Sequence, residues 1–126
     1  MNELEKVCRV IESCEGYSIG ALSMAVVDDG DMLDISLRWG PEKPDMTISL
    51  REVTYFEMGR DAGVPAGPLC ELQASVLLPT GAAWPEGLHF DRVRKWIDRP
   101  LIWVRVAGPV QLSVLASTAV VLKEVQ

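Results

Sequence analysis

The single histidine, His89, is the side chain best suited to acid–base chemistry near neutral pH. Asp91 follows it by two positions, but a Ser-His-Asp arrangement also needs a nucleophile held beside the histidine. Nothing near His89 marks a serine or cysteine as that nucleophile. We therefore interpret His89 as a surface residue or a local hydrogen-bonding group, and the sequence predicts no catalytic residue and no cofactor.

A metal site is not predicted either. A closed zinc site needs about four Cys or His ligands in clustered pairs, and this chain has one histidine and no C-x-x-C. The acidic stretch around Asp28 and Asp31 offers oxygen ligands, but it lacks the spacing and the final glutamate of a calcium-binding loop. We interpret this stretch as a solvated turn.

Three cysteines, Cys8, Cys14 and Cys70, cannot all pair within the chain. Cys8 and Cys14 lie about 120° apart around a predicted helix, which disfavours a disulfide between them. Reduced thiols, together with acidic residues rather than a signal peptide over positions 1–6, predict a cytoplasmic protein. The composition, rich in Arg, Ala, Gly and Pro, is typical of a bacterial source.

Binding residues are predicted in the loops and near their ends. The glycine-rich loop from Gly59 to Pro68 contains Arg60, but it has neither a dinucleotide-binding nor a phosphate-binding pattern. Trp84 lies in a second loop, where an exposed tryptophan would be a credible contact residue. The predicted binding set consists of Arg60, Trp84, His89, Asp91 and Arg92.

The net charge of −6 and the sequence pI near 4.7 limit the class of partner. A negative field disfavours nucleic acid and anionic membrane surfaces, and it would steer a basic protein towards this chain. We therefore predict a protein partner, and no nucleic-acid or membrane binding.

Hydrophobic periodicity predicts the first elements. Apolar residues recur at helical spacing from Asn2 to Cys14, and Gly16 is a natural stop. Residues 22–27 then alternate with period two, and the Asp29-Gly30 pair predicts a hairpin turn. In the return strand, Leu33, Ile35, Leu37 and Trp39 are predicted to face the core.

Later segments continue the pattern. A strand from Met46 changes its apolar parity, and a β-bulge near Arg51-Glu52 would resolve the conflict. Further strands are predicted over 70–78, 101–107 and 110–116. Residues 119–125 form a final strand or continue after a bend at Ser117-Thr118. Phe90 to Arg99 is predicted to be a short amphipathic helix ended by Pro100.

These elements predict one α+β domain over residues 1–126, mainly antiparallel, with about six or seven strands. We expect a meander rolled into a sandwich or partial barrel. The strand rhythm from Gly30 to Met58, "DGDMLDISLRW" followed by "MTISLREVTYFEM", resembles that of small bacterial immunity-type β-domains, which neutralise toxins. That resemblance implies a cytoplasmic, acidic domain that binds a protein partner.

Two alternatives remain open beside the protein-binding domain. The first is a small-molecule-binding barrel or weak enzyme, with an apolar pocket near His89 and with Asp91 and Glu57 as its acids. The second is a homo-oligomer formed through a strand edge such as Ala119 to Val125. An enclosed pocket of a few hundred cubic ångströms would favour the first alternative.

Overall fold

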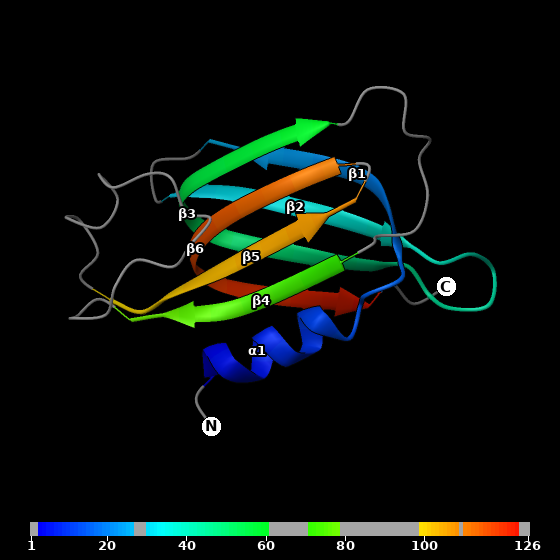
Figure 1. Cartoon of the computed structure of the whole chain (residues 1–126), viewed down its shortest axis with the longest axis horizontal. Coiled ribbons are helices and arrows are strands. Elements are labelled where there is room, and N and C mark those ends of the chain that lie inside the picture. Colours follow the sequence, from blue (N-terminus) through cyan, green and yellow to red (C-terminus); the bar gives the residue numbers. More distant parts are fainter. Residues whose placement is uncertain (1–2, 27–29, 61–70, 79–98, 109, 124–126) are drawn as a thin grey trace.

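A computed structural model describes residues 3–26, 30–60, 71–78, 99–108 and 110–123 (Figure 1). One helix, α1 (Glu3–Glu12), precedes six strands. The strands are β1 (Ser18–Ala25), β2 (Asp31–Arg38), β3 (Met46–Arg60), β4 (Glu71–Leu77), β5 (Leu101–Ala107) and β6 (Val110–Lys123). All neighbouring strands pair antiparallel in the order β1-β2-β3-β6-β5-β4, so the predicted mainly antiparallel α+β fold is confirmed.

Two three-stranded meanders share one sheet through the long strands β3 and β6. β2 pairs with β3 only as far as Val53, and β5 pairs with β6 only as far as Ala116. The first half of β3 and the second half of β6 therefore belong with β1 and β2, and the other halves belong with β4 and β5. Figure 1 shows the two groups as crossing layers, with β5 and β6 passing in front of β2. This arrangement is a single sheet folded over itself, as expected for a partial barrel.

Both long strands change direction at local irregularities. Met32 pairs with Arg51 and Asp31 pairs with Val53, so Glu52 is the extra residue of a β-bulge. Its φ of 53° lies in the left-handed region, which is strained for a glutamate. The predicted bulge at Arg51-Glu52 is thus confirmed.

In β6 the buried parity changes between Ala116 and Ala119, at the predicted bend. The strand is continuous to Lys123, so the residues after the bend do not form a separate strand.

The core lies between the two layers and is closed along one side by α1. Cys8 and Ile11 of the helix, followed by Cys14, belong to the same buried cluster as the inner-face residues of both layers, and α1 packs against β4, β5 and β6. Burying an isoleucine side chain such as that of Ile11 stabilises the fold by roughly 1.5–3 kcal/mol. The largest side chains with essentially no exposed surface are Ile11, Ile35, Leu37, Ile48, Leu50, Ile102, Leu115, Val104 and Val114.

A smaller apolar cluster lies on the outer face of the layer formed by β4 and β5. Leu77, Leu101, Trp103 and Leu115 are buried there, and Tyr55 packs against them. Trp103 alternates with inward-facing Ile102 and Val104, which explains why this strand is apolar on both faces.

The prediction that Trp39 faces the core is wrong. β2 ends at Arg38, and Gly40, with a φ of 134°, begins the turn directly afterwards. The Trp39 side chain is 42% exposed and packs edge-on against Tyr17, with ring centroids 5.2 Å apart. The Nζ atom of Lys43 lies 3.9 Å from its ring centroid.

Other boundaries move by a few residues. Gly59 and Arg60 belong to β3 rather than to the loop predicted to begin at Gly59. The predicted helix from Phe90 lies outside the described residues except for Arg99, which lies in a bend. Among the residues that the structure describes, no helix is long and apolar enough to cross a membrane.

Candidate functional site

The predicted binding residues are not brought together by the described part of the chain. Arg60 is the last residue of β3, and its side chain is not described. Trp84, His89, Asp91 and Arg92 lie outside the described residues. Their roles therefore stay predictions, whereas Glu57, named above as an acid of the alternative pocket, is described in detail.

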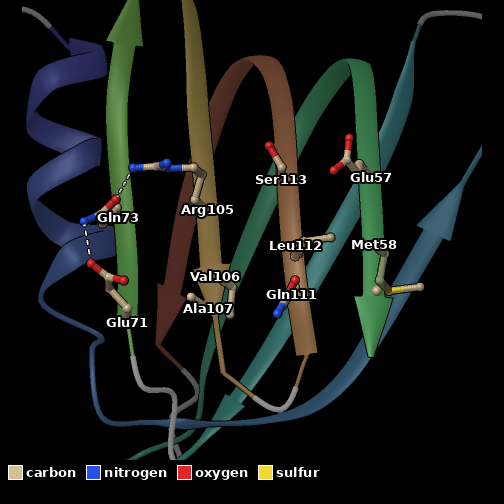
Figure 2. Close-up of a pocket in the computed structure, with 11 residues that line it drawn as sticks. Glu57, Met58, Glu71, Gln73, Arg105, Val106, Ala107, Gln111, Leu112 and Ser113 are labelled. Atoms are coloured by element: carbon tan, nitrogen blue, oxygen red, sulfur yellow. Dashed lines mark hydrogen bonds between the residues drawn. The ribbon is translucent and has the colours of Figure 1, made fainter. Parts of the chain in front are cut away.

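Polar side chains line up across four strands on the outer face of β4, β5, β6 and β3. Gln73 is opposite Arg105, Arg105 is opposite Ser113, and Ser113 is opposite Glu57. This transverse row borders a hollow of about 390 Å³, which we call the outer hollow (Figure 2). Its outward-facing lining consists of Glu57, Gly59, Glu71, Gln73, Arg105, Ala107, Gln111 and Ser113.

One wall of the outer hollow is a chain of polar contacts. The Gln73 Nε2 atom donates to Glu71 Oε1 at 2.7 Å, and Arg105 Nη2 donates to Gln73 Oε1. The Arg105 guanidinium also stacks over the Trp103 ring, with its Cζ atom 4.3 Å from the centroid. Figure 2 shows this chain running from β5 to the carboxylate on β4. The guanidinium is therefore held by an amide and a ring rather than by a carboxylate.

The opposite wall carries the second carboxylate. Tyr55 donates its hydroxyl proton to Glu57 Oε2 at 2.5 Å. This hydrogen bond stabilises the protonated phenol and is the main cause that raises the pKa of Tyr55 above its ordinary value. Each glutamate is thus oriented by a neighbour two positions away on the same strand, Glu57 by Tyr55 and Glu71 by Gln73.

Neither carboxylate is neutralised by a cation in the described ranges. The ion pairs found there join Lys6 to Glu3 at 3.6 Å and Arg99 to Glu52 at 3.2 Å. Glu57 and Glu71 are exposed. The outer hollow therefore presents two carboxylates and one guanidinium, none of which forms an ion pair with another described side chain.

Small residues keep the floor of the outer hollow open. Glu71 pairs with Ala107 on one side, and Gly59 pairs with Gln111 on the other. A Cβ atom built on Gly59 would meet nothing within 4 Å. The Nε1 atom of Trp103 donates to Ser113 Oγ at 2.8 Å, which fixes the centre of the polar row.

A serine pattern that the sequence prediction missed occurs at the start of β1. Gly16–Gly20 spells G-x-S-x-G, the pattern of the nucleophile turn in α/β-hydrolases. That turn joins a strand to a following helix, whereas Ser18 follows α1 and opens a strand, where it pairs with Arg38. The pattern therefore lacks the backbone setting in which it activates a serine.

The described side chains of the outer hollow offer charged and polar binding groups. Ser113 accepts a hydrogen bond from an indole, and no described hydrogen bond joins its hydroxyl to the Glu57 carboxylate opposite it. Within the described residues, no group of three or more His, Cys, Asp or Glu side chains could hold a metal ion. Two oriented carboxylates suit cationic groups, which they would bind by charge-assisted hydrogen bonds.

No family model, curated protein or solved structure matches this chain. The functional argument therefore depends on the geometry of the outer hollow and on the charge of the chain.

Proposed function

We propose that this chain is a non-catalytic, immunity-type protein-binding domain whose outer hollow receives a basic segment of a protein partner. The observation that carries the proposal is the pair Glu57 and Glu71, oriented by neighbours and left without a cation in the described part. The net charge of −6 adds long-range attraction for a basic partner. The buried, unbridged thiols of Cys8 and Cys14 support a reducing compartment, which we propose to be the bacterial cytoplasm.

Preorganisation makes these carboxylates suitable for binding. A free glutamate side chain loses rotamer freedom when it is immobilised at an interface, at a cost of roughly 0.5–1.5 kcal/mol. The Tyr55 and Gln73 hydrogen bonds already restrict Glu57 and Glu71 in the free protein. More of the ion-pair energy therefore remains as binding energy.

Strand spacing indicates what the partner segment looks like. Glu71 and Glu57 lie on β4 and β3, which are three strand spacings or about 14 Å apart, and their registers differ by two residues, so their Cα atoms are about 16 Å apart. An extended segment rises about 3.3 Å per residue, so its residues i and i+4 lie roughly 13 Å apart on one face. Basic residues at those two positions would reach both carboxylates, while Arg105 between them disfavours a third cation.

Affinity capture from extract of the source cells tests the proposal. The tagged wild-type chain should retain a basic protein, and E57Q/E71Q should retain at least ten times less of it. E12Q/E42Q changes the net charge equally at exposed glutamates outside the hollow, and it should bind like wild type. The capture should also weaken as salt rises, because exposed ion pairs are screened.

Two results would reject this function. Equal loss of the partner with both double variants would mean that net charge, not the outer hollow, is responsible. Native mass spectrometry could instead reveal a copurifying small molecule and no protein. That result would favour the small-molecule alternative, whose predicted residues His89 and Asp91 lie outside the described ranges.

A further inference from the structure

Arg105 supplies the positive charge among the described residues that line the outer hollow. It lies on β5, in the same row as Glu57 and one row from Glu71, so it lies between the two carboxylates. Its guanidinium carries five N–H donors, and in the described ranges Gln73 Oε1 is the acceptor found for them. Stacking over Trp103 holds the group in place without using those donors. The outer hollow therefore contains a positioned cation that can donate further hydrogen bonds.

A segment that covers the outer hollow would remove water from this cation. A charge that loses water without gaining a partner is costly. An uncharged or basic residue above Arg105 would bring no compensating charge. A carboxylate would bring one, because guanidinium and carboxylate groups form two parallel N–H···O hydrogen bonds. The outer hollow thus favours a segment that carries its own carboxylate between its basic residues.

The strand register gives the position of that carboxylate. With about 4.8 Å between strands and about 3.4 Å per residue, the Arg105 Cα atom projects about 7 Å along the line from Glu71 to Glu57, and it lies about 4 Å to one side of this line. Residue i+2 of an extended segment lies about 7 Å from residue i and points to the same face. The residue midway between the two basic residues is therefore the one nearest Arg105. On the other side of the line β5 presents Ala107, whose small side chain leaves room for the segment.

We propose that Arg105 binds an acidic residue at position i+2 of the segment, so that the outer hollow selects the pattern basic-x-acidic-x-basic. This inference rests on the proposed function and names the class of segment that the same site accepts. Gln73 and Trp103 act as positioning residues, because they hold the guanidinium while leaving Glu57 and Glu71 to the basic residues. The net charge of −6 predicts the opposite preference, since it attracts a segment most strongly when that segment carries no acid. A preference for an acidic central residue would therefore identify a local contact rather than the overall field.

Two synthetic peptides test this selection. TKTETKT and TKTQTKT, each acetylated and amidated, carry the same two lysines and differ in the central carboxylate. NMR titration of the isotope-labelled chain measures both Kd values from the amide shifts of Glu57, Glu71 and Arg105. The wild type should bind the glutamate peptide at least about three times more tightly, as for a favourable partly exposed ion pair. R105Q should bind the glutamine peptide more tightly, because it loses the cation and keeps both carboxylates. R51Q removes the same charge from an exposed arginine outside the outer hollow, and it should keep the wild-type preference.

The outcomes separate this proposal from the proposed function. If the wild type binds both peptides equally, or the glutamine peptide more tightly, and E57Q/E71Q binds neither, the outer hollow takes a basic segment but Arg105 does not select an acidic residue. A glutamate preference that persists in R105Q would overturn the role of Arg105 in the same way. Both proposals are wrong if neither peptide shifts these amides at about 5 mM, a concentration that detects even millimolar affinity, or if E57Q/E71Q binds both peptides as tightly as the wild type does.

Discussion

Tyr55 and Glu57 form the contact on which the geometry of one wall of the outer hollow depends. Glu57 accepts a hydrogen bond from the Tyr55 hydroxyl. Removing the negative charge of Glu57 should therefore lower the pKa of Tyr55 towards the ordinary tyrosine value. NMR titration of ring-labelled tyrosine should show this shift in E57Q. The control E42Q, in the turn before β3, should leave the Tyr55 pKa unchanged. An unchanged Tyr55 pKa in E57Q would mean that the two side chains are not hydrogen-bonded in solution.

The Cys8 thiol makes the stability of the fold depend on pH in the alkaline range. Burial is the largest cause, followed by the charges of Glu12 and Glu5, and together they raise the thiol pKa from 9.0 to about 11. The folded protein therefore holds this proton more tightly than the unfolded chain. The stabilisation is fully present below pH 9 and is lost as the pH rises to about 11, by at most about 2.7 kcal/mol.

Urea denaturation at several pH values measures that loss. C8A removes the thiol, so its free energy of unfolding should fall less between pH 9 and 11 than that of wild type. C8A should also be less stable at every pH, because it leaves a small cavity beside Ile11. Identical pH dependence in the two proteins would show that the Cys8 pKa is not raised.

At the scale of elements, the bulge at Glu52 allows β3 to serve both layers. A non-glycine residue in the left-handed region costs roughly 1–3 kcal/mol, and β-branched residues tolerate it least. The free energy of unfolding of E52V should therefore be at least about 1 kcal/mol lower than that of E52G. Both variants lose the exposed pair with Arg99, so the difference between them does not depend on that pair.

A neighbouring substitution serves as the control for the bulge. Arg51 is exposed and precedes the irregularity in the same strand. R51V should change stability by less than about 0.5 kcal/mol, as for most surface substitutions. If E52V proved as stable as E52G in urea denaturation, the left-handed backbone at this position would be contradicted.

The helix and most strands could be predicted from the sequence, because the spacing of apolar residues within each element shows which of its faces is buried. The alternation of Leu33, Ile35 and Leu37 marked a strand with one buried face, and all three are buried. The parity conflict after Leu50 even located the bulge. Trp39 failed because alternation continues in sequence after the backbone has already entered the turn at Gly40.

At the scale of the whole molecule, the outer hollow depends on strand register, which no local pattern contains. Gln73, Arg105, Ser113 and Glu57 come from four strands, and only the pairing places them in one row. Sequence reasoning proposed Glu57 for a different pocket, and it did not identify Glu71, Gln73 or Arg105. Their signal was present only as polar residues alternating with the apolar set of each strand.

The long β3–β6 ladder also has a kinetic consequence. It joins Met46 to Lys123 and Arg60 to Val110, residues separated by 77 and 50 positions along the chain (123 − 46 and 110 − 60). Neighbouring strands within each meander can pair after closure of shorter loops. Pairing of β3 with β6 requires closure of a long loop. Chains dominated by such distant pairings have a high contact order and refold in milliseconds to seconds.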